Sequence, residues 1–162
     1  MRPRRRRPPQ AGGRRSTHTG GAGRRSPLLA VGDLPPRDAF LLNPYDDLRY
    51  TRCPRCSHRT WRRKVPLLLV IAGYGPVVLG KTGPYCAHCR LVIAHRDELE
   101  GELTTIFAQR APAVVGGAYT VLGTVDLRAW RRGLSAAPTL EEVLRHTAPF
   151  TTTITIDYAA VR

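Results

Sequence analysis

The pattern of apolar residues in the middle of the chain predicts a β-hairpin. Residues 65–72 read Val-Pro-Leu-Leu-Leu-Val-Ile-Ala, an apolar run of strand length that is rich in β-forming residues. Glycines at 73 and 75 supply a turn. The extended pattern then resumes over residues 76–79 and breaks at Pro84. Pro66 cannot donate a ladder hydrogen bond, so it suits an edge strand or the beginning of a strand.

Helical spacing is clearest over residues 95–110, where we predict the main helix. The residues of its apolar face recur at i, i+4, i+7 and i+8: Leu99, Leu103, Ile106 and Phe107. Acidic residues fall in its first turns, which matches the helix dipole. A second helix is predicted over residues 139–146, because Thr139 and Glu142 have the spacing of a capping box.

Shorter strands complete the expected fold. Residues 38–42 form an apolar patch, residues 91–94 and 118–125 have strand composition, and residues 151–161 alternate and are rich in Thr and Ile. A short segment capped by Asp126 follows the strand at 118–125. We therefore expect the α+β class: a small hairpin packed with one main helix and a C-terminal strand-helix-strand portion.

The charge of the chain is unevenly distributed. The formal net charge is +14, but residues 1–27 hold nine arginines and no acidic residue, which leaves 17 basic and 12 acidic residues in the remainder. The first 27 residues consist almost wholly of Arg, Pro, Gly, Ser and Thr, and such a composition has little to bury. We predict a disordered tail over residues 1–37 and a single domain over residues 38–162.

The apolar segments are too short for a membrane span or a secretory signal. Residues 65–72 fall far below the roughly 18 to 20 apolar residues of a spanning helix, and the short run at 27–31 is the only apolar stretch near the start. We therefore expect a cytoplasmic protein without a membrane partner. In a reducing compartment, four cysteines are more readily metal ligands or redox groups than disulfides.

The four cysteines form two Cys-x-x-Cys pairs, and this spacing is typical of a zinc site. Two residues between cysteines allow a tight turn to direct both sulfurs at one ion. The 29 residues between the pairs exceed the spacing of about 15 to 20 residues in the simplest zinc-site pattern, but a longer hairpin accommodates them. Four thiolates leave no open coordination position, so we expect one structural Zn²⁺ and no catalytic metal. The predicted ligands are Cys53, Cys56, Cys86 and Cys89.

Two other chemistries fit the same residues less well. A Cys-Pro-x-Cys pair also occurs in dithiol redox enzymes, but the residues after Cys56 do not form a convincing helix. His58, His88 and His95 could serve as further ligands, although surface and helix-start positions are the simpler interpretation.

A basic and aromatic cluster flanks the first cysteine pair. Residues 49–64 contain seven positive charges and no acidic residue. Arginines beside an aromatic residue on a rigid turn could bind phosphates and stacked bases, whereas the alternative is a set of solvated strand positions with Trp61 covering the core. The residues predicted to bind nucleic acid are Arg52, Arg55, Arg59, Trp61, Arg62, Arg63 and Lys64.

The segment from Tyr50 to His95 resembles the zinc ribbon proteins, with the two cysteine pairs as the zinc-binding knuckles. The wider stretch 43–130 resembles an uncharacterised bacterial zinc-ribbon family. This resemblance implies a structural zinc and no catalytic residue. We therefore expect a non-enzymatic binding or adaptor module, with RNA or DNA as the first candidate partner and a protein as the second; no small-molecule substrate is indicated. The alternatives are a protein interaction module without nucleic-acid binding and a dithiol redox enzyme.

Overall fold

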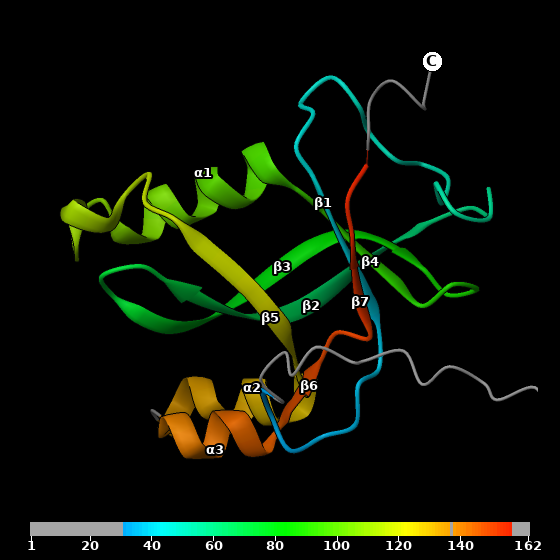
Figure 1. The fold of residues 1–162 in the computed structure, drawn as a ribbon. Helices are drawn as coiled ribbons and strands as arrows, with labels where there is room; N and C mark the ends of the chain where they lie inside the picture. Colours follow the sequence, from blue (N-terminus) through cyan, green and yellow to red (C-terminus); the bar gives the residue numbers. More distant parts are fainter. Residues whose placement is uncertain (1–30, 137, 157–162) are drawn as a thin grey trace, which may run out of the picture.

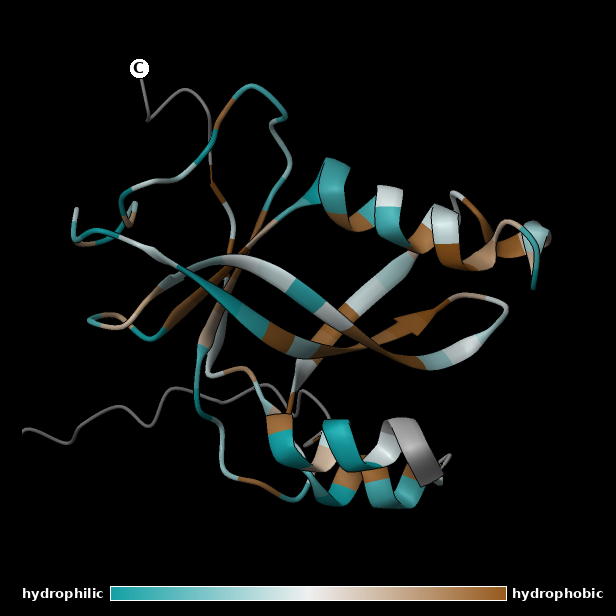
Figure 2. Cartoon of the chain, turned by 180° about the vertical axis from the view of Figure 1, so that it is seen from behind, coloured by the Kyte–Doolittle hydropathy of each residue, from teal (hydrophilic) through white to brown (hydrophobic). Residues whose placement is uncertain are grey.

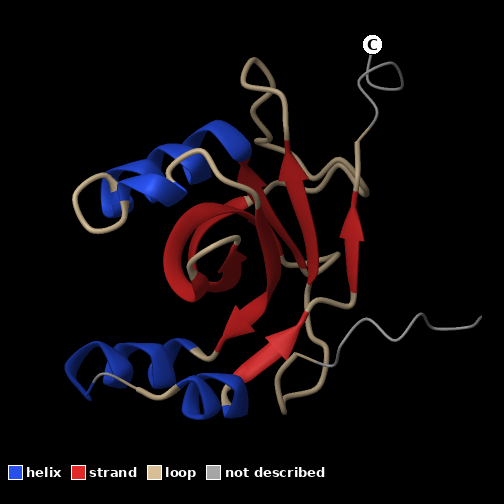
Figure 3. Cartoon of the chain, turned by 60° about the vertical axis from the view of Figure 1, so that its left-hand side comes forward, coloured by secondary structure: helices blue, strands red, loops and turns tan. Residues whose placement is uncertain are grey.

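The chain folds into one curled β-sheet with helices on both sides (Figures 1 and 3). The computed structural model describes residues 31–136 and 138–156. The described residues form a seven-stranded sheet in the order β6-β5-β2-β3-β4-β1-β7. Helix α1 lies on one side of the sheet, and α2 and α3 lie on the other. The expected α+β class is confirmed.

The predicted hairpin is present and is longer than the sequence suggested. Strand β2 (Trp61–Ile71) pairs with β3 (Gly75–Cys86) in antiparallel register from Trp61 opposite Tyr85 to Ile71 opposite Gly75. Gly73 and Gly75 take positive φ angles of 78° and 112° in the turn, a conformation that glycine adopts without steric cost. Trp61 and the basic residues 62–64 join the strand because pairing with β3 satisfies their backbone groups.

The hairpin is the centre of the sheet and not a separate ribbon. Strand β2 also pairs with β5 (Tyr119–Val125), so β2 is an inner strand rather than an edge strand. Residues 67–71 carry the pairing with β5, and Pro66 itself has no partner there, which explains how the sheet tolerates its missing N–H.

Strand β1 (Ala39–Asn43) lies between two parallel neighbours that the sequence did not indicate. It pairs with β4 (Leu91–His95) and with β7 (Thr152–Ile154). Strand β4 also pairs with the end of β3. The parallel pair β1–β4 is joined by a connection that contains the whole hairpin.

Helix α1 (Arg96–Phe107) packs three residues of its predicted apolar face on the sheet, whereas the fourth, Ile106, is 36% exposed. Its buried residues are Leu99, Leu103 and Phe107, and Figure 2 shows its hydrophobic positions on the side turned toward the strands. The main core cluster joins this face to strand residues Phe40, Val65, Leu67, Leu69, Ile71, Leu79, Val92 and Ala94. His95 precedes the helix as its N-cap residue. A 3₁₀ turn (Pro112–Val114) follows.

The C-terminal portion contains more elements than predicted. Helix α2 (Leu127–Ala136) extends well beyond a short segment at Asp126, whose carboxylate accepts bonds from the amides of Arg128 and Ala129. Helix α3 (Leu140–Arg145) begins at Thr139, and the Thr139 hydroxyl accepts a hydrogen bond from the Glu142 amide as the capping box requires.

The prediction of one terminal strand over residues 151–161 was wrong in its extent. Two three-residue strands occur instead, β6 (Thr147–Pro149) and β7, on opposite edges of the sheet. Strand β6 pairs with β5, and the chain then crosses to the opposite edge of the sheet, where β7 pairs with β1. Residues 157–161 lie outside the described residues.

The boundary predicted at residue 37 falls within an ordered segment. Backbone bonds join Asp33 to Leu144, Leu34 to Thr147 and Arg37 to Pro149. Residues 31–37 therefore belong to the folded part, because their amides find partners at the end of α3 and along β6. Residues 1–30 of the predicted tail lie outside the described residues.

Candidate metal centre

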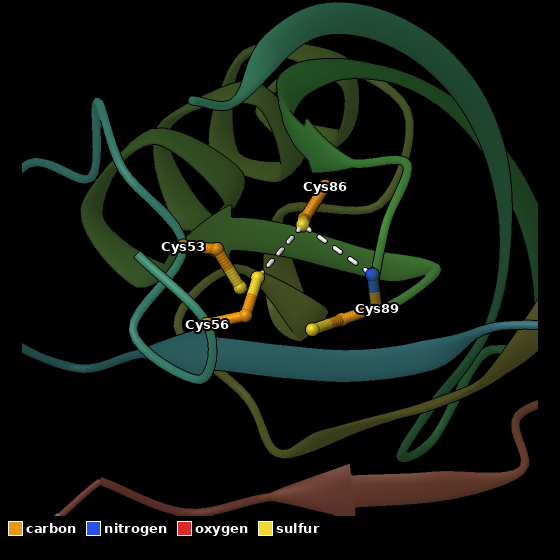
Figure 4. A group of neighbouring side chains, drawn as sticks. All are labelled: Cys53, Cys56, Cys86 and Cys89. Carbon is orange, nitrogen blue, oxygen red and sulfur yellow. Dashed lines mark hydrogen bonds between the residues drawn. The ribbon is translucent and has the colours of Figure 1, made fainter. Parts of the chain in front are cut away.

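The four cysteines come from two turns that the fold brings together. Cys53 and Cys56 lie in the connection between β1 and β2, and Cys86 and Cys89 lie at the turn from β3 to β4. Figure 4 shows the four side chains gathered around a common centre. All four sulfurs lie within 4.8 Å of one another, and the Cys56 and Cys86 sulfurs are 3.6 Å apart. The cysteines are all free.

These distances fit a tetrahedral metal site and exclude a disulfide. A Zn–S bond of about 2.3 Å places tetrahedral sulfurs about 3.8 Å apart, whereas a disulfide needs about 2.05 Å. The cysteines are thus positioned to hold one metal ion, as the sequence predicted.

The two turns have matching backbone geometry. The residue after the second cysteine takes a positive φ in each, 58° at Ser57 and 52° at Arg90. The Ser57 amide donates to the Cys53 carbonyl at 2.8 Å, and the Cys89 amide donates to the Cys86 sulfur at 3.5 Å. Non-glycine residues rarely adopt this conformation, so both turns hold a local strain where the sulfurs must converge.

The first cysteine of each pair is buried, and the second is partly exposed. Cys53 and Cys86 are 1% and 0% exposed, within a second core cluster that includes Ala39, Leu41, Leu91 and Ile93. The metal centre therefore continues the packing beneath strands β1 and β4. A polar pair lies at the end of the same strands, where the Asn43 amide nitrogen is 3.0 Å from Nδ1 of buried His95.

The thiols of the cluster differ in pKa. A hydrogen bond from the His58 amide lowers the pKa of Cys56 to about 6. The hydrogen bond with Cys56, followed by burial, raises the pKa of Cys89 to about 12, and burial raises the pKa of Cys53. The Cys56 thiolate is thus stabilised first by the His58 amide and then by hydrogen bonds from the neighbouring thiols. A divalent cation would replace those protons and neutralise the thiolates together.

The predicted redox alternative lacks its usual structural support. Cys53 to Cys56 form a turn, and among the described residues no helix begins at this pair. A lowered thiolate pKa at Cys56 comes from a turn amide rather than from a helix N-terminus.

Two histidines that are distant in sequence meet beside the cysteines. The rings of His58 and His88 stack with centroids 4.2 Å apart, and their ring nitrogens lie within 4.8 Å of the Cys56 sulfur. Both side chains are exposed, as predicted for surface neighbours. No sequence spacing signals this contact, because it depends on the two turns facing each other.

The predicted nucleic-acid-binding residues are all exposed, and we call them the basic face: Arg52, Arg55, Arg59, Trp61, Arg62, Arg63 and Lys64. Three of the cations lie over aromatic rings, Arg59 over Trp61, Arg63 over Tyr85, and Lys64 over Trp130, at 5.1, 4.5 and 5.1 Å. Within the described part of the chain, no salt bridge joins any of the six cations to a carboxylate.

Trp61 does not cover the core. Its side chain is 59% exposed, so the alternative in which Trp61 packs inside is wrong. Arg52 donates to the Ser57 carbonyl across the first turn, and a β-bridge joins Arg52 to Arg59. The first cysteine turn thereby holds Arg52 and Arg59 of the basic face in place.

Comparison of the chain with protein-family models, curated proteins and solved structures gave no match. The resemblance to zinc ribbons therefore rests on the two cysteine turns alone. Within the described ranges, no helix has the length and apolar content needed to cross a bilayer.

Proposed function

We propose that the chain is a non-enzymatic binding module, stabilised by one structural zinc ion, that binds single-stranded nucleic acid through the basic face. The observation that carries the proposal is the set of six exposed cations, beside an exposed tryptophan, that form no salt bridge with a carboxylate of the described residues. Solvated cations on a folded surface commonly acquire acidic neighbours, and their absence here favours a polyanion as the partner.

Zinc is the metal that the ligand set favours. Soft thiolates in a tetrahedral set select zinc or iron, and zinc needs no redox partner. With four thiolates bound, the ion has no free position for substrate or water, so its role is to hold the two turns. Elemental analysis of the purified protein tests this assignment. One zinc per chain supports it, and iron or no metal would contradict it.

The nucleic-acid proposal is tested by matched removal of charge. We compare Arg59→Gln/Arg62→Gln/Arg63→Gln with Arg96→Gln/Arg110→Gln/Arg145→Gln, which removes three exposed arginines that lie in α1, in the turn after α1 and in α3. Both variants keep the arginine-rich residues 1–27, and the net charge of one variant equals that of the other. Binding of labelled single-stranded RNA and DNA is measured by anisotropy across salt concentrations.

The first variant should lose affinity by tenfold or more and show a salt slope lower by up to about three, while the second changes little. Equal effects of the two variants would mean that only total charge matters and would reject the basic face. Retained zinc in both variants establishes that the fold is intact.

A protein partner is the second candidate, and one observation favours it. An apolar cavity of about 320 Å³ lies between the sheet and helices α2 and α3, with Trp130, Val125 and Val143 among its lining residues. Binding of a protein with no effect of the basic-face variant would favour this function. We keep a cytoplasmic location and the absence of catalysis as parts of the proposal.

A further inference from the structure

A cavity of about 390 Å³ lies between the first cysteine turn and the sheet. It is lined by residues 49–51 before the turn, residues 59–62 after it, residues 83–84 of β3, and His95 and Glu98 at the start of α1. This volume lies within the range of about 300 to 1,000 Å³ that is usual for small-ligand sites. Only Arg59, Trp61 and Arg62 of its lining belong to the basic face.

Aromatic and cationic groups meet at the mouth of this cavity. Trp61 is 59% exposed and has the Arg59 guanidinium 5.1 Å from its ring centroid. Arg62 is exposed and forms no salt bridge with the described carboxylates, whereas Arg49 is paired with Asp97. Two uncompensated guanidinium groups beside a large exposed ring suit a planar ligand that carries negative charge.

The deeper wall is preorganised by contacts across the turn. The ring of Tyr50 stacks on buried His95, with centroids 6.4 Å apart and an interplanar angle of 11°. The Thr60 hydroxyl donates to the Tyr50 carbonyl at 3.1 Å, and the Thr60 amide donates to the Thr51 carbonyl at 3.1 Å. These bonds hold the two sides of the cavity together, so a ligand meets a formed site.

The acidic residue in the lining does not cancel the positive charge. The Glu98 carboxylate accepts a hydrogen bond at 3.0 Å from the buried Lys81 ammonium. Burial opposes ionisation of Glu98, but the bond from Lys81 outweighs it and lowers the pKa of the carboxyl group. Because Lys81 also donates to Glu102, the three groups together carry one net negative charge, which is less than the two positive charges of Arg59 and Arg62 at the cavity.

We infer that this cavity binds one unstacked nucleotide of a single-stranded nucleic acid, an inference that rests on the proposed function. The base stacks on Trp61, and Arg59 and Arg62 contact the adjoining phosphates. Aromatic stacking of a base depends on the ring and not on total charge, so the cavity makes binding dependent on bases as well as on phosphates.

The test compares two ligands that carry the same phosphates. Anisotropy of the zinc-loaded full chain is measured with a labelled oligothymidylate 10-mer and with a 10-mer of abasic deoxynucleotides. The chain should bind the oligothymidylate at least tenfold more tightly, which is within the contribution of one stacked base. An oligouridylate 10-mer identifies whether RNA or DNA is preferred, and base-dependent affinity for either one supports the inference.

Trp61→Ala should reduce the ratio of the two affinities to about one. The matched control is Tyr74→Ala, which removes another exposed aromatic residue at the opposite end of the same hairpin and should leave the ratio unchanged. Because Trp61 is exposed, the variant should keep its zinc, and retained zinc checks that it is folded.

The outcomes separate this inference from the function on which it rests. Equal, salt-dependent binding of both oligomers by the wild-type chain would overturn the nucleotide site and leave the basic face as a phosphate-binding surface. A ratio unchanged by Trp61→Ala would also overturn it. Binding of no oligomer at low salt would overturn the proposed function as well.

Discussion

Lys81, Glu98 and Glu102 form an ion triad, and we expect the free energy of unfolding to fall by different amounts when different members are replaced. Lys81 lies in β3 with only 5% of its side chain exposed, and its ammonium donates to Glu98 at 3.0 Å and to Glu102 at 2.7 Å. The two carboxylates belong to α1 and are 39% and 42% exposed. One side of the triad is thus buried, whereas the other side is open to water.

Glu98→Gln/Glu102→Gln should lower the free energy of unfolding by about 3 kcal/mol, because it leaves a buried ammonium without an anionic partner. Lys81→Met should change that free energy by less than about 1 kcal/mol, because it removes the buried charge and leaves two carboxylates that water can solvate. The apolar stem that replaces Lys81 also keeps the packing against α1.

Urea unfolding of the zinc-loaded protein, followed by circular dichroism, measures both changes. Glu141→Gln serves as the control, since its exposed pair with Arg145 should contribute under about 0.5 kcal/mol. A larger loss for Lys81→Met than for the double variant would refute the reasoning.

The same triad sets the direction of a pH dependence. Burial alone would raise the pKa of Glu98 and lower the pKa of Lys81. The hydrogen bonds within the triad outweigh burial, so that the pKa of Glu98 is lowered and the pKa of Lys81 is raised. A lowered carboxyl pKa gives stability that is present above the unfolded value, near 4.5, and is lost as the pH falls through the folded pKa. The raised lysine pKa gives stability that is lost only as the pH rises through its folded value, above 10.5. The wild type should therefore lose more stability than Lys81→Met below about pH 4.

Three further predictions concern the metal centre and its surroundings. Chelation of the metal should lower the midpoint of thermal unfolding by about 10 °C or more, because structural zinc contributes several kcal/mol; an unchanged midpoint in a metal-free sample would contradict a structural role. Ser57→Gly should raise the free energy of unfolding by about 0.5 kcal/mol by relieving the positive φ, and Ser57→Val should lower it by about 1–2 kcal/mol; urea titration distinguishes this order from its reverse. Tyr50→Phe should be neutral or stabilising by up to about 1 kcal/mol, because the Tyr50 hydroxyl is buried without a hydrogen-bond partner among the described residues; a loss above 1 kcal/mol in the same titration would reveal a partner.

Local features of the sequence predicted the elements whose geometry is fixed by near neighbours. The spacing of each cysteine pair is enough to form a turn with converging sulfurs, so the four cysteines that cluster could be predicted without the fold. The apolar face of α1 and the Thr139 cap were likewise predicted, because helical contacts and caps join residues three or four positions apart.

Tertiary structure decided everything that depends on which strands become neighbours. The parallel pairing of β1 with β4, the inner position of β2 and the separation of β6 from β7 depend on residues with no local relationship. The same long-range pairing buries Lys81 beneath two glutamates, stacks His58 on His88 and encloses the cavity beside Trp61. Composition identifies these side chains as charged or aromatic, but their burial and partners follow from backbone hydrogen bonding across the sheet, which sequence periodicity does not encode.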